Sequence, residues 1–192
     1  QPPALETNFD VKDNSCFDGF DGRITANIKG GIPTYQLLWS TDAKTSTIEN
    51  LTSGTYVLTV TDNNGCESIT PVQVGQPEAI EIEIEPGEIT CAGGRDGNFT
   101  VMALGGTNPY TYSIDNKSFT SNATFLGLSA GSYDVYVQDR NGCVQIASTE
   151  LSDPPPFEVF IFPQEDFIEI EFGNEIQLFA NANNNTGIVE YV

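Results

Sequence analysis

Histidine is absent from the 192-residue sequence, and lysine and arginine together number only 7. Because histidine is the most frequent general base and a common zinc ligand, its absence argues against both kinds of site. The 27 acidic residues give a formal net charge of −20, and such a surface repels nucleic acid and anionic membranes. No apolar run approaches the roughly 18 residues of a membrane-spanning helix. We therefore expect neither nucleic acid as a partner nor membrane insertion.

The residues that are present indicate a folded β protein. Hydrophobic residues make up 39% of the chain, with 12 Phe and 7 Tyr, so a core can be buried. The 18 Gly and 11 Pro interrupt the chain every few residues, which is typical of short strands and turns. The chain opens on Gln1 without a signal-peptide pattern, and we expect a mature or interior piece of a longer protein.

The chain contains an internal repeat of about 75 residues. Residues 21–31 (DGRITANIKGG) align with residues 96–106 (DGNFTVMALGG), and residues 51–66 align with residues 128–143. A proline-containing boundary recurs as QPPAL, QPEAI and DPPPF, which suits stiff junctions. These features predict a first repeat at 1–75, a second at 76–152, and a partial third unit at 153–192 that is truncated.

Apolar residues alternate with polar ones along the aligned segments. This period of two, with turn signals every 8–12 residues, predicts all-β architecture: tandem small antiparallel immunoglobulin-like β-sandwiches, each closed by one disulfide. The inward-facing residues predicted for the first repeat are Ile24, Ala26, Ile28, Tyr35, Leu37, Trp39, Tyr56, Leu58 and Val60. Their counterparts in the second repeat are Phe99, Val101, Ala103, Tyr110, Tyr112, Ile114, Tyr133, Val135 and Val137.

The phrase Asp-x-Asn-Gly-Cys ends both aligned blocks, at residues 62–66 and 139–143. It lies between two predicted strands, and Asn-Gly supplies the positive φ of a tight hairpin turn. The aspartate can accept hydrogen bonds from backbone amides within the turn. The phrase therefore predicts a hairpin.

The four cysteines allow three disulfide pairings. We expect Cys16–Cys66 and Cys91–Cys143, because the same bond then recurs in both repeats. Each bond would close a loop of about 50 residues and stabilise its repeat by roughly 4 kcal/mol. No Cys-x-x-Cys pair is present, so zinc is disfavoured. Disulfides imply an oxidising, extracellular environment.

The order of these motifs resembles the SprB repeat of cell-surface proteins in gliding and related Bacteroidota. The resemblance rests on Cys, Asp-Gly, GG-x-P-x-Y at 30–35, Trp39, and L-x-x-G-x-Y-x-x-x-V-x-D-x-x-G-C, over about 16–66 and 91–143. The second repeat departs from it at GGTNPY and at Ile114, which replaces the tryptophan. The resemblance implies long extracellular adhesins of the bacterial cell surface, built from many tandem repeats, exported by type IX secretion and linked to gliding motility.

The segment after Pro154 lacks cysteine and Asp-Gly and resembles the start of a PKD-like or immunoglobulin-like domain. It carries Phe157, Phe160, Phe162, Phe167 and Phe172, which need a surface to cover them. Truncation of a longer chain is one interpretation, and donation of strands from 157–182 to a neighbouring molecule is the other.

Two kinds of ligand site remain hypotheses. Carboxylates near the cysteines could bind calcium at one end of a sandwich; the candidates are Asp18, Asp21, Asp62, Asp96 and Asp139. Otherwise no cofactor is expected. Tyr136, on a predicted outward face beside Asp134, could stack on a sugar, but the first repeat has Thr59 there.

The sequence offers no catalytic residues, so an enzyme is not expected. We expect a structural spacer or filament segment of a large extracellular adhesin, whose partners are the neighbouring repeats of the same chain. The alternative is that the repeats themselves are an adhesive module that binds surface polysaccharide or other cells. A binder needs a surface patch common to both repeats, and none is evident.

Overall fold

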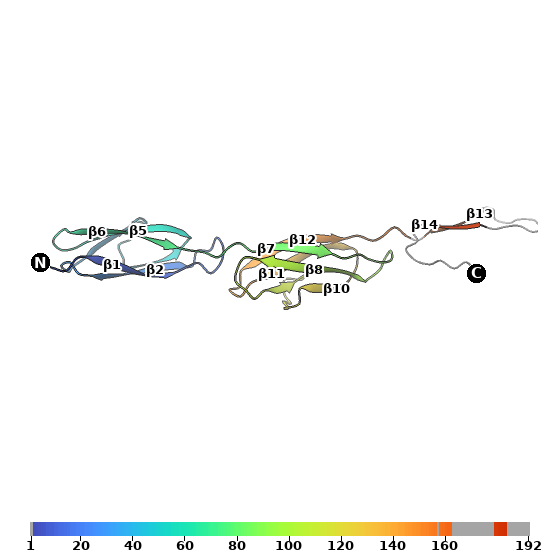
Figure 1. Ribbon diagram of the computed structural model, residues 1–192, viewed down its shortest axis with the longest axis horizontal. Helices are drawn as coiled ribbons and strands as arrows, with labels where there is room; N and C mark the ends of the chain where they lie inside the picture. Colours follow the sequence, from blue (N-terminus) through green and yellow to red (C-terminus); the bar gives the residue numbers. More distant parts are fainter. Residues whose placement is uncertain (1, 157, 163–178, 184–192) are drawn as a thin grey trace, which may run out of the picture. The chain divides into compact units, whose positions relative to one another are not determined.

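The computed structural model describes residues 2–156, 158–162 and 179–183, and every regular element among them is a β-strand (Figure 1). None of the described residues forms a helix long and apolar enough to cross a membrane. The chain divides into two compact units. The first comprises Gln1–Glu83, Met102–Ser121 and Val135–Ala147; the second comprises Ile84–Val101, Asn122–Asp134 and Ser148–Val192. The all-β, immunoglobulin-like fold predicted from the sequence is confirmed.

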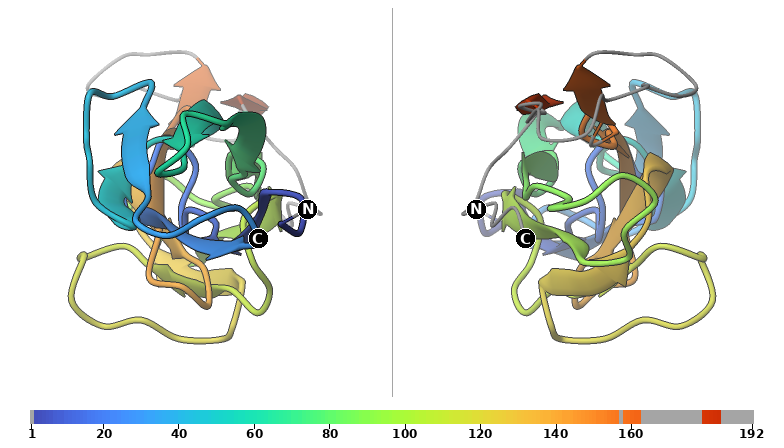
Figure 2. Two further views of the ribbon diagram at one scale, coloured as in Figure 1. Left: turned by 90° about the vertical axis from the view of Figure 1, so that its left-hand side faces the viewer. Right: turned by 90° about the vertical axis from the view of Figure 1, so that its right-hand side faces the viewer.

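The first repeat forms two three-stranded antiparallel sheets, ordered β1-β2-β4 and β3-β5-β6. This is the arrangement of strands A, B, E and C, F, G in an immunoglobulin-like sandwich. Figure 1 shows the two layers, with β5 and β6 in one and β1 and β2 in the other, and Figure 2 views the chain from its two ends. The strand bounds are β1 Glu6–Lys12, β2 Gly22–Lys29, β3 Gln36–Trp39, β4 Thr47–Leu51, β5 Gly54–Thr61 and β6 Glu67–Val74.

The second repeat has the same strand order, β10-β8-β7 and β12-β11-β9. Its strands occupy the positions that the internal alignment gives them, so the alignment correctly predicted the topology. The bounds are β7 Glu81–Pro86, β8 Gly97–Leu104, β9 Thr111–Ser113, β10 Thr124–Leu128, β11 Gly131–Gln138 and β12 Val144–Leu151.

Two further strands follow the second repeat. β13 (Glu158–Phe162) pairs antiparallel with β14 (Phe179–Asn183). Within the described residues these strands therefore pair with each other. Phe157, Phe167 and Phe172 of the predicted apolar segment lie outside the described residues, so strand donation stays a prediction.

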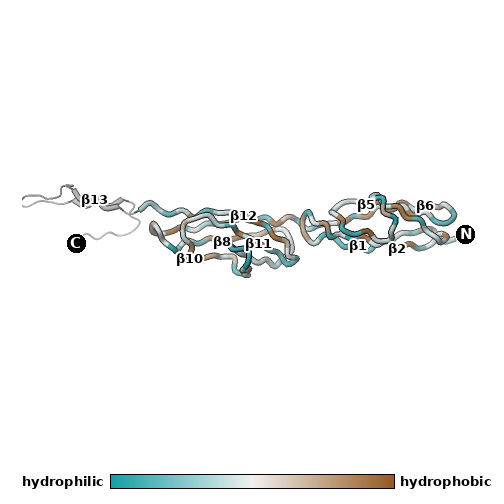
Figure 3. Tube along the Cα trace, turned by 180° about the vertical axis from the view of Figure 1, so that it is seen from behind, coloured by the Kyte–Doolittle hydropathy of each residue, from teal (hydrophilic) through white to brown (hydrophobic). Residues whose placement is uncertain are grey.

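The core of the first sandwich includes residues that the alternation placed inward, together with Ile48, Leu51 and Val74, which it did not predict. Ile24, Leu58 and Val60 have no exposed surface, and Trp39 is 1% exposed. Phe9 of β1 packs against Trp39 with ring centroids 5.8 Å apart, and the Trp39 indole N–H donates to the Thr45 carbonyl at 2.9 Å. In Figure 3 brown apolar and teal polar stretches alternate along the strands, as this packing requires.

The second repeat places its large aromatic side chains at different positions. Phe99 and Phe125 replace Ile24 and Ile48, and their ring centroids are 5.2 Å apart. Phe99 also packs on Tyr133 at 5.9 Å. Ile114, in place of Trp39, is only partly buried. The first repeat thus has its large core aromatic residue on β3, whereas the second has its two phenylalanines on β8 and β10.

A tyrosine corner holds the turn between the E and F strands in each repeat. The Tyr56 hydroxyl donates to the Thr52 carbonyl at 3.0 Å, and the Tyr133 hydroxyl donates to the Ser129 carbonyl at 2.8 Å. The L-x-x-G-x-Y motif encodes this corner, since it places the tyrosine five residues after the leucine that ends the E-strand segment. Its function is structural.

Candidate functional site

The Asp-x-Asn-Gly-Cys turn is built around a buried carboxylate. Asp62 is 5% exposed, and its Oδ1 accepts from the N–H groups of Asn64 (2.9 Å) and Cys66 (2.8 Å). Its Oδ2 accepts from the Ile32 N–H at 2.9 Å, across the sheet end. Gly65 supplies the positive φ, 80°. The predicted hairpin is confirmed, and the aspartate additionally ties it to the loop that follows β2.

The second repeat builds the same turn with nearly identical distances. Asp139, also 5% exposed, accepts from the N–H groups of Asn141 and Cys143, each at 2.9 Å, and of Thr107 at 2.9 Å. Gly142 has φ 85°. Both turns therefore hold their cysteine in the same backbone frame.

Hydrogen bonds lower the pKa values of several aspartates. For Asp62 the main cause of the lowered pKa is the Ile32 N–H, followed by the Cys66 N–H, and burial opposes them. For Asp21 it is the Lys12 ammonium, 2.7 Å away, followed by the Ser15 hydroxyl. The Thr90 hydroxyl lowers the pKa of Asp96, and the Ser118 N–H lowers that of Asp115. These carboxylates are ionised and held by protein donors.

The disulfide joins Cys16 to Cys143, with Cα atoms 5.6 Å apart, whereas Cys66 and Cys91 are exposed free thiols. The predicted pairs Cys16–Cys66 and Cys91–Cys143 are therefore wrong. The bond links the two repeats instead of closing a loop within each of them.

The geometry of β6 explains why the pairing within the first repeat fails. The loop that carries Cys16 is hydrogen-bonded to the residue that follows β6: the Asn14 N–H donates to the Gly75 carbonyl at 3.0 Å. Cys66 immediately precedes the start of this eight-residue strand. An eight-residue strand spans about 27 Å, far beyond the roughly 7 Å limit between the Cα atoms of a disulfide. The cysteines lie at opposite ends of the sandwich.

Further contacts fix the bridge in place. The Asn141 side-chain amide donates to the Ser15 carbonyl at 2.9 Å and to the Thr107 hydroxyl at 3.2 Å. The Asp18 N–H donates to the Gln76 side-chain oxygen at 3.0 Å. The Sγ of Cys143 lies 3.4 Å from the Ser15 carbonyl oxygen. The bonded loop and the Asn-Gly-Cys turn thus meet through specific polar contacts as well as through sulfur.

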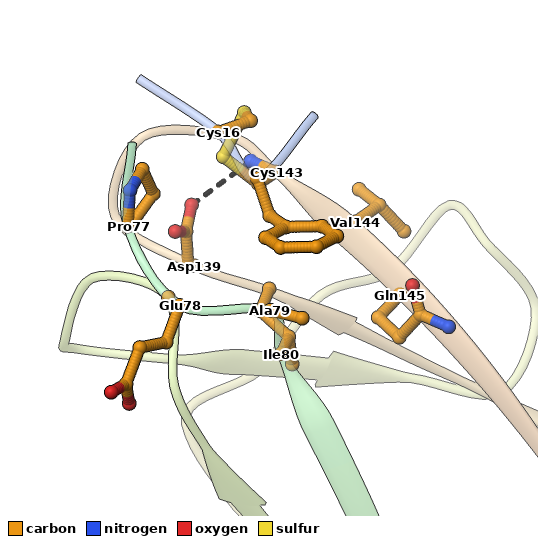
Figure 4. Close-up of a pocket in the computed structure, with 12 residues that line it drawn as sticks. Cys16, Pro77, Glu78, Ala79, Ile80, Asp139, Cys143, Val144 and Gln145 are labelled. Atoms are coloured by element: carbon orange, nitrogen blue, oxygen red, sulfur yellow. Dashed lines mark hydrogen bonds between the residues drawn. A yellow bond between two sulfur atoms is a disulfide. The ribbon is translucent and has the colours of Figure 1, made fainter. Parts of the chain in front are cut away.

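A pocket lies beside the disulfide (Figure 4). Its walls are largely apolar and include Phe17, Pro77, Ala79, Ile80 and Val144. Asp139 also lines it, and its carboxylate accepts hydrogen bonds from three backbone amides. The pocket can bury the edge of an apolar side chain, and Glu78 and Gln145 are further polar residues of its lining.

The five aspartates proposed for calcium do not converge. Within the part of the chain that the structure describes, no three acidic or cysteine side chains could hold one metal ion. Asp62 and Asp139 bind backbone amides, Asp21 binds Lys12 and Ser15, and Asp96 accepts from the Thr90 hydroxyl at 2.6 Å. Asp18 lies in the same loop as Cys16, with φ 51°.

We expect the melting temperature of the oxidised chain to be the same in 1 mM EDTA and in excess Ca²⁺, within about 1 °C, because four of the five carboxylates already accept hydrogen bonds from protein donors. Differential scanning calorimetry in a chelated buffer measures it directly. A rise of several degrees on adding Ca²⁺, lost in Asp21→Asn, would instead support a calcium site.

Tyr136, the sugar-binding candidate, is partly buried on β11 and pairs with Ser113 on β9. Asp134 accepts from the Ser148 hydroxyl at 2.7 Å. Their predicted role in binding a ligand stays a prediction.

The fold and the bridged turns define a tandem array of immunoglobulin-like β-sandwich repeats. The family model of the SprB repeat matches two regions of the chain, residues 8–44 and 86–119. The resemblance expected from the sequence is thereby confirmed. Both Asn-Gly-Cys turns lie outside the matched regions. The family model therefore covers Cys16 of the disulfide but not Cys143.

Solved structures with related folds are distant, and no curated protein matches the chain. A C-terminal fragment of intimin, solved in complex with the intimin-binding domain of its receptor Tir, is 13% identical, with a TM-score of 0.38; the match covers 84% of this chain and 68% of that one. A Dscam structure is 18% identical, with a TM-score of 0.32 and coverage of 80% and 47%. Fibronectin(III)-like modules of Clostridium thermocellum CbhA are 14% identical, with a TM-score of 0.35 and coverage of 77% and 94%. The chain spans about half the length of the Dscam structure.

Proposed function

We propose that this chain is a structural spacer within a large extracellular adhesin of the bacterial cell surface. The observation that carries the proposal is the Cys16–Cys143 bond, which joins the loop of one repeat to the turn of the next. A bond between repeats restricts how one moves against the other, which is useful in a spacer and unnecessary in independent binding modules. Disulfides persist outside the cytoplasm, in agreement with this location.

The match to the SprB repeat supports a cell-surface, adhesin-associated repeat. Surface attachment, gliding motility, type IX export and assembly into a filament are parts of the proposal that come from the resemblance alone. The proposed partners are neighbouring repeats of the same chain. The net charge of −20 supports solubility and repulsion between arrays rather than attraction to anionic polymers.

The alternative function, an adhesive module, requires a surface that both repeats present. Among the exposed large apolar side chains of the described residues, only Ile69 and Ile146 occupy equivalent positions. One isoleucine per repeat, 65% and 51% exposed, is far smaller than a typical recognition patch. Tyr136 has Thr59 as its counterpart. These observations favour the spacer.

Binding measurements separate the two functions. We expect the oxidised full chain to show no saturable binding to a panel of bacterial surface polysaccharides by biolayer interferometry. A matched variant, Tyr136→Thr, places the first repeat's residue at the candidate position and is expected to behave identically. Saturable binding by the wild-type chain that Tyr136→Thr abolishes would make the repeats adhesive and overturn the spacer proposal.

A further inference from the structure

The two free thiols are the repeat equivalents of the two bonded cysteines. Cys91 follows Cys16 by 75 residues, and Cys66 precedes Cys143 by 77 residues, which are the offsets of the internal alignment. The observed bond therefore joins the loop cysteine of the first repeat to the turn cysteine of the second. The turn cysteine of the first repeat and the loop cysteine of the second are left exposed and unpaired.

The surroundings of Cys66 reproduce those of bonded Cys143. Asp62 holds the Cys66 N–H at 2.8 Å, as Asp139 holds the Cys143 N–H at 2.9 Å. Asn64 stands in the place of Asn141, whose amide reaches the carbonyl beside Cys16. The first repeat thus presents the same turn, with the same polar side chain available to meet a cysteine loop.

The wall next to this turn is also built twice. Beside Cys143, Pro77, Ala79 and Ile80 line the pocket, and the Gly106 N–H donates to the Glu78 carbonyl at 2.9 Å. Beside Cys66, the Gly31 N–H donates to the Pro3 carbonyl at 2.9 Å. A Cβ on Gly31 would meet Leu5 and Asp62, as one on Gly106 would meet Ile80 and Asp139. Pro2 to Leu5 therefore form the counterpart of Pro77 to Ile80.

The loop cysteines match in the same way. The Gly19 N–H closes onto the Cys16 carbonyl at 3.1 Å, and the Gly94 N–H closes onto the Cys91 carbonyl at 2.8 Å. In both loops the residue before the cysteine donates a hydrogen bond from its hydroxyl to the aspartate five residues after the cysteine. Ser15 donates to Asp21 at 2.7 Å, and Thr90 donates to Asp96 at 2.6 Å. The loop around Cys91 therefore has the same hydrogen bonds as the loop around Cys16.

We propose that the exposed Cys66 thiol is one half of a disulfide between repeats. Cys66 pairs with the loop cysteine of another repeat of the same kind, docked against the wall that Pro2 to Leu5 form beside it. The bond forms by thiol–disulfide exchange. The thiolate of one cysteine attacks a small disulfide, the oxidant, which gives a mixed disulfide and releases one thiol of the oxidant. The partner thiolate then displaces the second oxidant thiol, so that two cysteines lose two protons and two electrons to the oxidant.

The test adds one repeat to the complete chain. Residues 1–75 are fused in front of Gln1, so that Gly75 followed by Gln1 recreates the Gly75–Gln76 junction. The added copy carries Cys66→Ser, which removes its own turn cysteine. It also carries Phe20→Tyr, at a side chain that is 71% exposed, so that its loop peptide has a distinct mass. The protein is oxidised in a glutathione redox buffer, alkylated and mapped by mass spectrometry.

We expect the marked loop peptide to be bonded to Cys66, the unmarked loop peptide to Cys143, and Cys91 to be alkylated as the one free thiol. In a control with Cys66→Ser in both copies, the marked loop cysteine should be alkylated while Cys16–Cys143 persists. The Cys16–Cys143 bond reports that the chain has folded. A marked loop thiol that stays alkylated in the presence of that bond, or unmarked Cys16 bonded to Cys66, would overturn the proposal. Because this outcome does not depend on any ligand, it is independent of whether the spacer function holds.

Discussion

Replacement of Trp39 by alanine is expected to destabilise the first sandwich by about 3–5 kcal/mol. The side chain is 1% exposed, packs on Phe9 and donates its indole N–H to the Thr45 carbonyl. Truncation would leave a cavity at the centre of the core and an unpaired carbonyl next to it. Denaturant unfolding of the oxidised full chain, followed by circular dichroism, measures the loss.

Ile114→Ala provides the matched control for that substitution. Ile114 is the counterpart of Trp39, but it is only partly buried, and Phe99 and Phe125 supply the aromatic packing of the second repeat. Its truncation should cost clearly less than that of Trp39. A Trp39→Ala chain within about 1 kcal/mol of the wild type would mean that the C strand contributes little to the core.

Loss of the Cys16–Cys143 bond should have the second large effect. The bond spans 127 residues of sequence, and the chain-entropy model gives a stabilisation of roughly 5 kcal/mol for a loop of that length. Cys143→Ser should therefore lower the midpoint of denaturant unfolding strongly, whereas Cys66→Ser, at an exposed free thiol, should change stability by less than about 0.5 kcal/mol.

The contrast between these two variants distinguishes the pairings. If Cys16 were bonded to Cys66 within one repeat, Cys66→Ser would destabilise the chain as much as Cys143→Ser does. Equal effects would thus contradict the bond between repeats. Adding a reducing agent to the wild-type chain should reproduce the Cys143→Ser result, and adding it to Cys143→Ser should have no further effect.

The strand pattern could be predicted from the sequence because the side-chain period of two is local. Ile24, Leu58 and Val60 are buried as the alternation requires, and Phe99, Val101 and Val137 repeat this in the second copy. The alignment of the copies then transferred every strand. The partial burial of Ile114 follows from its substitution for tryptophan. That Phe125 supplies the missing aromatic packing could not be predicted from the residues around Phe125.

The disulfide pairing could not be predicted, because repeat symmetry fixes the kind of partner and leaves open which copy supplies it. A bond between a loop cysteine and a turn cysteine obeys the symmetry equally well within one repeat or between successive ones. Only the position of the Cys16 loop beside Gly75, at the far end of β6 from Cys66, decides between them. The long-range role of Asp62 was missed as well; the Gly-Gly pair before Ile32, repeated before Thr107, was the available signal.

The position of the Cys16–Cys143 bond also determines how tension would travel along the chain. A pull applied at the two ends enters at residue 16, crosses the sulfur atoms and leaves at residue 143. Residues 17–142, which include β2 to β11, lie outside that covalent path. About 430 Å of extended chain therefore stays stored while the bond is intact. Only β1 and β12, with the segments beyond them, can be peeled away.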